Sequence, residues 1–409
     1  MGKTLLLLMF SGASLLLNAA DGDKMNRKAE KIHRKIITLD SHNDTPLRMM
    51  QKGFDMAVRH DPKVDRSRVD LPRMKEGGLD GAFFAVFVSQ GSCDSSGYSK
   101  ARRKVSAMFD TINSMLSRND SAIELALSPE DAERLKAEGK RILFIGMENG
   151  YPLGRDTGMI RHYFRKGARY ITLCHTTNND ICTSSTDSVI STGLNPFGVT
   201  VVKKMNELGM MIDVSHASDK AFYDILQVSC APVIASHSCA RALCDNPRNL
   251  DDSMLMALAR NGGVVQMCIL SEYVKKSPLS YARDSAWAAL RKKYNNFDNL
   301  SEEQMNLARK EWYAIDDLFP VRLATVQDVV DHIDHIVQVA GIDHAGIGTD
   351  FDGGGGVKGC RDVSEMKNIT IELLHRGYRK KEIEKIWGGN LLRVMKANAT
   401  LTKNIVSGK

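Results

Sequence analysis

The chain has 409 residues, and its 56 Lys and Arg residues against 49 Asp and Glu residues give a formal net charge of +7. The basic residues are dispersed among acidic ones and are not interleaved with aromatic residues, a pattern that disfavours nucleic acid as a partner. The length exceeds that of one ordinary domain but fits a single α/β barrel with loop insertions.

The first 20 residues predict a secretory signal peptide. Lys3 precedes an apolar run over residues 5–17, and the small residues Ala19 and Ala20 follow it. The run is too short to span a membrane. The C-terminal residues 398–409 carry no hydrophobic tail that would signal a lipid anchor. We therefore expect residues 21–409 to form one domain, exported to a periplasm or outside the cell, without a stable membrane anchor.

Eight short apolar runs, each ending in polar or charged residues, predict β-strands. They cover residues 35–44, 81–89, 141–148, 169–175, 209–216, 231–237, 261–270 and 344–350. Amphipathic stretches between them predict helices at residues 99–116, 195–209, 218–227, 251–262 and 326–341. Strand and helix alternating eight times predict a (β/α)₈ barrel, the TIM barrel. Residues 271–323 predict a helical insertion after the seventh strand, placed where it could wall or cover a site.

The eight cysteines leave disulfide formation open. Cys93 and Cys182 lie in polar, Ser-rich segments and are the best candidates for a bridge. Four others lie in or beside apolar runs and are predicted to be buried thiols: Cys174, Cys230, Cys239 and Cys268. No spacing resembles a zinc knuckle.

The first predicted strand ends in His42 and Asp44, two metal-ligand residue types at positions i and i+2. In a strand, such residues point to the same face. The alternative is an ordinary polar turn, since Ser, His, Asn, Asp and Pro are common in loops. Other strand ends carry the same residue types: Glu148 (third), His175 (fourth), His216 (fifth), His237 (sixth) and Asp350 (eighth).

Barrel enzymes place their chemistry at the carboxyl ends of the strands, so these residues are expected to converge. Each alone is compatible with a structural role, but together they would need seven coincidences. The remaining histidines fall in helices or connections and receive no role: His33, His60, His162, His332, His335, His344 and His375.

Several histidines with carboxylates favour Zn²⁺ over Mg²⁺ or Ca²⁺. The number of ligands suits two ions that share a bridging carboxylate and a hydroxide nucleophile. Glu148 is the expected bridge. Asp350 is left to orient the hydroxide and carry its proton to the leaving amine.

Several motifs resemble those of the membrane dipeptidase family, also called renal dipeptidases. They are DSHNDTPL, VDLPRMKEGGLDGAFFAVFV, YITLCHTTNN, MMIDVSHAS, APVIASHS, NPRNLDD and HAGIGTDFDGG, and the likeness extends from about Ile36 to WGGNLLRVM. The resemblance implies an exopeptidase that hydrolyses dipeptides with a free C-terminal carboxylate, including those with a C-terminal D-residue. Dipeptides are thus the expected partners, and a homodimer is left open.

The resemblance also implies roles for individual residues. His42 and Asp44 would bind one zinc, His216 and His237 the other, and Glu148 both. Three further residues would bind substrate: His175 at the scissile carbonyl, Arg248 at the terminal carboxylate and Tyr273 in the side-chain pocket. Asp350 would lie near the bridging water.

Three features depart from the family pattern. Asn149 follows the bridging glutamate where a glycine is expected, which could reshape the rim of the site. Thr177 stands where vertebrate members have a disulfide cysteine, so a Cys93–Cys182 bridge is an analogy only. Vertebrate members carry a C-terminal lipid anchor, for which this sequence gives no support.

Two other functions remain as alternatives. The first is another metal-dependent amidohydrolase, a deaminase or cyclic-amide hydrolase, but such enzymes commonly carry HxH on the first strand and a carboxylated lysine as the bridge. Here His42 and Asp44 form HxD, and the third strand supplies Glu148. The second is a non-catalytic metal-binding relative, which would have no need of Asp350 as a proton shuttle.

Overall fold

The computed structural model describes residues 24–278, 280–297 and 300–407. The predicted signal peptide, residues 1–20, lies outside them. Eight parallel strands form the path β1-β2-β4-β5-β6-β7-β8-β9. Their bounds are β1 (Leu39–Asn43), β2 (Gly81–Phe87), β4 (Arg141–Glu148), β5 (Ala168–Thr172), β6 (Met211–Asp213), β7 (Ile234–Ser238), β8 (Val264–Cys268) and β9 (Ala345–Gly348). The eight predicted strands are confirmed.

The barrel closes between β9 and β1 just beyond the last residue of β9. The backbone N–H of Asp350 donates to the carbonyl of His42 over 2.9 Å, and that of Asp44 donates to the carbonyl of Phe351 over 2.8 Å. The buried carboxylate of Asp40 also accepts from the backbone and the hydroxyl of Thr349, each over 2.7 Å. These contacts place the residue after β1 and the residues after β9 beside each other.

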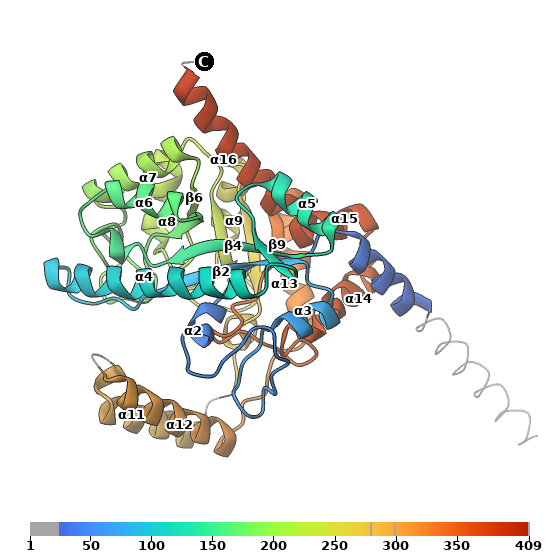
Figure 1. Ribbon diagram of the computed structural model, residues 1–409, viewed down its shortest axis with the longest axis horizontal. Coiled ribbons are helices and arrows are strands. Elements are labelled where there is room, and N and C mark those ends of the chain that lie inside the picture. The colour runs from blue at the N-terminus through green and yellow to red at the C-terminus, as the bar shows by residue number, and fades with distance from the viewer. Residues whose placement is uncertain (1–23, 279, 298–299, 408–409) are drawn as a thin grey trace, which may run out of the picture.

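The predicted helices surround the barrel (Figure 1). The five predicted from periodicity are α4 (Ser95–Arg118), α7 (Pro196–Leu208), α8 (Asp219–Val228), α9 (Asp252–Arg260) and α13 (Val326–Ala340). Their N-termini are fixed by side chains that accept a backbone N–H, a preferred way to begin a helix. Asn195, Ser218, Asp251 and Thr325 serve α7, α8, α9 and α13 in this way.

Other elements complete the fold. They are α2 (Thr45–Met49), α3 (Leu71–Gly77), β3 (Ile123–Leu125), α5 (Pro129–Glu138), α6 (Gly158–Arg165), α14 (Lys367–His375), α15 (Lys380–Glu384) and α16 (Asn390–Ser407). The short strand β3 pairs with β4 outside the closed path and was not among the predicted strands. Its three residues are too few to show a period-two pattern.

The barrel interior changes from apolar to polar along its axis. Side chains from successive strands pack together in one buried cluster with α16: Leu39, Phe83, Phe144, Tyr170, Met211, Ile234, Val264, Leu391, Val394 and Met395. Within it, the rings of Phe83 and Phe144 stack 4.7 Å apart. The polar residues follow at the carboxyl ends of the strands, as expected for a barrel enzyme.

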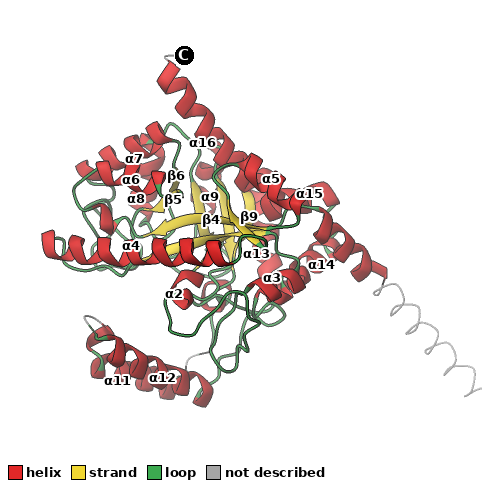
Figure 2. Cartoon of the chain, in the orientation of Figure 1, coloured by secondary structure: helices red, strands yellow, loops and turns green. Residues whose placement is uncertain are grey.

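The insertion after β8 is helical, as predicted. It contains α10 (Ser271–Val274), α11 (Tyr281–Lys293) and α12 (Glu302–Leu318). In Figure 2, α11 and α12 pack on each other at the edge of the molecule, on the side of α2. Leu290, Tyr294 and Ala308 form a buried cluster of their own between them. Contacts of this helix pair with the loop after α2 include an Arg66–Asp317 ion pair of 2.7 Å.

All eight cysteines lie in the described ranges and are free thiols. Cys93 is exposed and Cys182 is buried, so the candidate bridge between them is not present. Cys230, predicted to be buried, is exposed because the residue falls in the turn that precedes β7. Within the described part of the chain, no helix has the length and apolar character needed to cross a membrane.

Candidate metal centre

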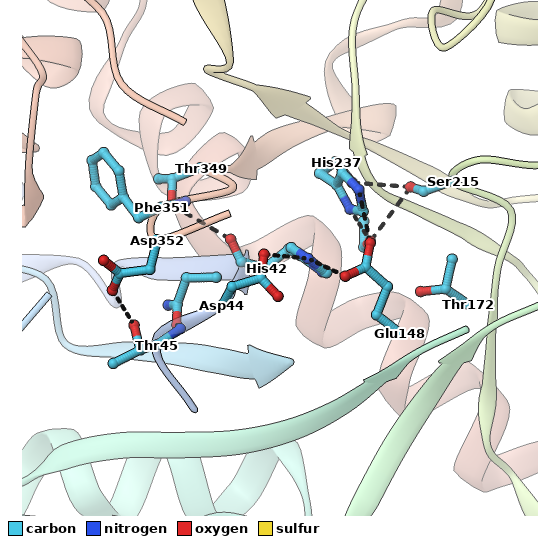
Figure 3. Close-up of polar contacts among 12 residues, drawn as sticks. His42, Asp44, Thr45, Glu148, Thr172, Ser215, His237, Thr349, Phe351 and Asp352 are labelled. Carbon is cyan, nitrogen blue, oxygen red and sulfur yellow. Dashed lines mark hydrogen bonds and ion pairs between the residues drawn. The ribbon is translucent and has the colours of Figure 1, made fainter. Parts of the chain in front are cut away.

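Glu148, the last residue of β4, lies among four imidazoles that stand in or just after four other strands. Its Oε1 is 3.1 Å from Nε2 of His216, 3.6 Å from Nε2 of His237 and 3.8 Å from Nε2 of His175. Its Oε2 is 3.6 Å from Nε2 of His42. Figure 3 shows Glu148 with one oxygen directed to His42 and the other to His237. One oxygen of the carboxylate therefore faces three histidines, and the other faces His42.

Asp44 and Asp350 lie beside His42. Asp44 Oδ2 is 3.8 Å from His42 Nε2, and His42, Asp44 and Asp350 each offer an atom to one group of the size that could hold an ion. Gly353 allows this close approach, because a Cβ at that position would lie 2.0 Å from Asp44 Oδ2 and 2.4 Å from Asp350 Oδ1. The glycine-rich turn after β9 thus packs directly against both carboxylates.

The ligand-type side chains are buried, and some lack partners. His42 is fully buried, Glu148 is 3% exposed and Asp350 is 7% exposed. His42 Nε2 and Asp44 Oδ1 have no hydrogen-bond partner among the described residues. Buried polar atoms are nearly always satisfied. Imidazole nitrogens and carboxylate oxygens gathered within 4.8 Å of one another, some of them unsatisfied, are what a divalent cation needs, so the residues present fit a metal.

The carboxylates differ in their electrostatic surroundings. Burial acts to raise the pKa of Glu148, but the imidazoles of His42 and His175 outweigh it and hold the pKa well below its usual range. Burial raises the pKa of Asp44 to about 6, with the charge of Glu148 adding to the effect. Burial also raises the pKa of Asp350 well above its usual range. Glu148 is therefore the carboxylate most firmly held as an anion.

Backbone conformation at the strand ends is unusual. His216 has φ 69° and Asp350 has φ 57°, in the left-handed region that costs energy for most residues and recurs at functional sites. Asn149 has φ 76°, which explains why a glycine is expected there and why an asparagine is tolerated. Its side chain bonds the carbonyl of Val88 over 3.1 Å and the backbone N–H of Tyr151 over 3.1 Å. Asn149 therefore ties together loops at the rim.

Arg248 is buried at this end of the barrel, only 3% exposed. Its guanidinium donates to the carbonyl of His237 over 3.2 Å, and its Cζ lies 5.4 Å from the ring centre of Tyr273. Its Nε has no partner within the described chain. The acidic residues near it in sequence pair elsewhere, Asp252 with His335 at 2.7 Å and Asp245 with Lys276 at 3.5 Å. The arginine is thus a buried cation with unused donor capacity beside the histidines.

His175 and Tyr273 complete the surroundings. The His175 side chain is 23% exposed, the most accessible of the imidazoles around Glu148. It packs edge-on against Phe87 with ring centres 4.7 Å apart. Burial raises the pKa of Tyr273 to about 12, so the phenol is neutral. All nine predicted site residues therefore lie at the same end of the barrel, around Glu148 and Arg248.

Sequence reasoning missed two residues that contact the histidines around Glu148. Tyr170 contacts His42 Nδ1 over 2.8 Å, and Ser236 contacts His237 Nδ1 over 2.8 Å. The signal available in the sequence was weak: Tyr170 and Ser236 occur within strands whose ends were already noted. Tyr170 and His42 lie 128 residues apart and meet only through the fold of the barrel, whereas Ser236 bonds the residue that follows it.

Together, a (β/α)₈ barrel and a buried cluster of histidines and carboxylates at the carboxyl ends of its strands define a metal-dependent hydrolase. The family model described as membrane dipeptidase, peptidase family M19, matches residues 26–407. The chain belongs to the membrane dipeptidase family, whose members are metal-dependent dipeptidases.

Individual relatives agree with this assignment. The chain is 32% identical over 366 residues to dipeptidase tcpJ of Claviceps purpurea, covering 87% of this chain and 76% of the relative. It is 33% identical to dipeptidase 3 of Macaca fascicularis, covering 91% of this chain and 67% of the relative. The crystal structure of the probable dipeptidase PvdM from Pseudomonas aeruginosa superimposes with a TM-score of 0.80 at 32% identity, covering 93% of this chain and 99% of that one. The predicted barrel and family are confirmed.

Proposed function

We propose that this chain is an exported dizinc dipeptidase that hydrolyses the single peptide bond of dipeptides with a free C-terminal carboxylate, including those with a C-terminal D-residue. The observation that carries the proposal is the position of Glu148, with two oxygens facing separate histidines at 3.1 to 3.8 Å. A carboxylate so placed is suited to bridge two cations about 3.5–4 Å apart.

The donor atoms divide into two sets around that bridge. His42 and Asp44 with Glu148 would hold one ion, and His216 and His237 with Glu148 the other. Imidazole nitrogens and carboxylate oxygens are ligands that suit Zn²⁺. When bound, the ions would supply Lewis acidity to polarise the scissile carbonyl and to make a water molecule acidic enough to attack it at neutral pH.

Arg248 would determine which substrates fit. Its planar guanidinium can make two parallel hydrogen bonds to a carboxylate, and its Nε is unpaired in the structure. A fixed distance between this cation and Glu148 would allow one residue between the terminal carboxylate and the cleaved bond. That geometry separates a dipeptidase from an enzyme that accepts longer chains.

His175 and Asp350 would act on the reacting atoms. The partly exposed His175 would donate from Nε2 to the scissile carbonyl oxygen as negative charge develops there. Asp350 would hold the proton lost by the attacking water and pass it to the leaving amine. The raised pKa of Asp350, caused by burial, is the direction that a proton carrier needs. Tyr273, beside Arg248, would line the side-chain pocket.

The test is hydrolysis of L-alanyl-L-alanine, its C-terminal amide and the corresponding tripeptide by the purified protein. We expect release of two amino acids from the dipeptide and slow cleavage of the other two compounds. Equal cleavage of dipeptide and amide would contradict carboxylate recognition. Hydrolysis of a cyclic amide or a nucleobase without dipeptide cleavage would support the amidohydrolase alternative, and metal binding without any turnover would support a non-catalytic relative.

A further inference from the structure

Two histidines of the proposed centre bond a hydroxyl group through Nδ1. The two hydroxyls differ in the group to which each makes its other hydrogen bond. His237 Nδ1 is 2.8 Å from Ser236 Oγ, and His42 Nδ1 is 2.8 Å from Tyr170 Oη. In both rings the opposite nitrogen, Nε2, faces Glu148. The hydrogen bond at one ring nitrogen decides which nitrogen keeps a free lone pair.

Behind Ser236 lies a buried carboxylate. The Ser236 hydroxyl donates to Asp213 Oδ2 over 2.6 Å. A hydroxyl has one proton, and Ser236 donates it to Asp213, so Ser236 accepts the bond from His237. His237 therefore carries its proton on Nδ1, and its Nε2 lone pair faces Glu148.

Asp213 is fully buried, and its side-chain oxygens accept three hydrogen bonds besides the one from the Ser236 hydroxyl. These come from the Thr172 hydroxyl over 2.5 Å and from the backbone N–H groups of Ser236 over 2.8 Å and Ser215 over 3.0 Å. Within the described residues Asp213 has no Lys or Arg partner. It is connected to His237 through the Ser236 hydroxyl.

Behind Tyr170 lies only a carbonyl group. The Tyr170 hydroxyl is 3.3 Å from the carbonyl oxygen of Ser41 and can donate its single proton there. It can then accept the Nδ1 proton of His42, so that Nε2 is the nitrogen that gives up its proton when a metal binds. The ring reaches this position because residue 146 is glycine, since a Cβ there would lie 2.0 Å from Tyr170 Cζ. The hydroxyl that contacts His42 thus belongs to a phenol bonded to a backbone carbonyl, whereas the hydroxyl that contacts His237 is bonded to a carboxylate.

We propose that Asp213 and Ser236 together, and Tyr170 separately, are positioning residues that set the metal affinity of the two halves of the centre independently. The inference rests on the two metal sites of the proposed function. Partners of this kind fix the ring orientation and increase the donor strength of a histidine, and their loss typically lowers metal affinity about 10- to 100-fold. The half with His216 and His237 depends on the buried carboxylate, and the half with His42 and Asp44 on the phenol.

The test is a Zn²⁺ titration of metal-free protein in competition with a chromophoric chelator, which yields two dissociation constants. We expect Ser236→Ala to weaken one binding step about 10- to 100-fold and to leave the other unchanged. Tyr170→Phe should weaken one step by a similar factor, and the double variant should weaken both steps. Asp213→Asn should act like Ser236→Ala, and combining these two should add little, since both break one relay.

Thr370→Val is the matched control. Thr370 Oγ1 makes a buried 2.7 Å bond to Nδ1 of His33, away from the metal centre. Thr370→Val should lower the melting temperature of the metal-free protein, as we also expect of Ser236→Ala. Unlike Ser236→Ala, it should leave both metal affinities unchanged. Ser236→Thr, which keeps the hydroxyl, should restore the affinity lost in Ser236→Ala.

Wild-type protein is measured first. If it binds fewer than two ions or fails to cleave dipeptides, the proposed function is wrong, and the inference, which depends on it, is wrong as well. If it binds two ions and cleaves dipeptides, while Ser236→Ala and Tyr170→Phe keep both wild-type affinities, the positioning roles alone are wrong. Equal weakening of both steps by Ser236→Ala would overturn the independence of the two halves.

Discussion

Glu148 places a negative charge between the histidines that would hold the two proposed ions, and this charge would offset the repulsion between those ions. Its Oε1 faces His216 at 3.1 Å and its Oε2 faces His42 at 3.6 Å, and the imidazoles lower its pKa, so it is ionised throughout the neutral range. An amide of the same shape would keep the packing but lose the charge. The consequences of that change can be separated from loss of fold, because the core lies below the site.

Glu148→Gln should therefore lose at least one metal ion and almost all turnover while keeping the fold. Metal analysis of the purified variant, with circular dichroism as the check on folding, measures both. Two bound ions and near-normal hydrolysis in this variant would show that Glu148 is not the bridge.

Asp350 lies beside Asp44 but is not needed in either proposed ligand set. Asp350→Asn should keep both ions and slow hydrolysis about 10²- to 10⁴-fold, the usual effect of removing a positioned acid or base. The measurement is kcat together with metal content. If metal content falls in parallel with kcat, Asp350 is a ligand and the proton-carrying role is wrong.

Arg248 is buried without a carboxylate partner in the described chain, and its removal should act on substrate rather than on metal. Arg248→Ala should strongly lower kcat/KM for free dipeptides with metal content intact. Arg248→Lys should recover only part of it, because an ammonium group cannot make the two-point contact. Dipeptide amides should lose little in either variant. An equal loss for amides and free acids would mean that Arg248 supports the fold of the site instead.

At the scale of elements, the sequence predicted the positions of the residues that lie at the ends of strands. His175, His216 and Glu148 lie together because parallel strands of a barrel end at the same rim, which the sequence pattern predicts. The orienting partners could not be foreseen in that way. The pairing of β1 shifts register between Asp40 and Asn43, and that of β7 between Ala235 and Ser238. Consecutive residues, such as Ser236 and His237, therefore both reach buried polar partners, which strict period-two alternation does not allow.

The helix pair α11–α12 is an element with a small core of its own. Trp287 and Trp312 pack edge to face with ring centres 4.6 Å apart beside the Leu290 cluster. Ion pairs at partly exposed positions, such as Arg66–Asp317, add little stability. Such a unit should open independently of the barrel.

Trp312→Ala should accordingly speed hydrogen exchange in residues 281–318 and leave the barrel strands as protected as before. Tyr281→Ala is the control, because that side chain is 82% exposed and should matter little. The KM for dipeptides, measured alongside, tests the prediction that the insertion walls the site. Faster exchange across β1 to β9 would show that the helix pair is part of the main cooperative unit.

For the whole molecule, the barrel, its helical insertion and the convergence of the ligand-type residues were all within reach of the sequence. The separation of Cys93 from Cys182 and the exposure of Cys230 were not predicted, because local polarity does not determine which loops meet. Asn149 shows the same limit: the sequence marked it as a departure, but only its left-handed backbone explains the preference for glycine.

The central claim is that hydrolysis of dipeptides depends on metal ions held by this end of the barrel. The most direct measurement is the turnover of a small panel of L,L and L,D dipeptides before metal removal by a chelator, after it, and after Zn²⁺ is added back. We expect both classes to be cleaved, activity to disappear in the metal-free protein, and Zn²⁺ to restore it. Undiminished hydrolysis by protein shown to contain no metal would contradict the account.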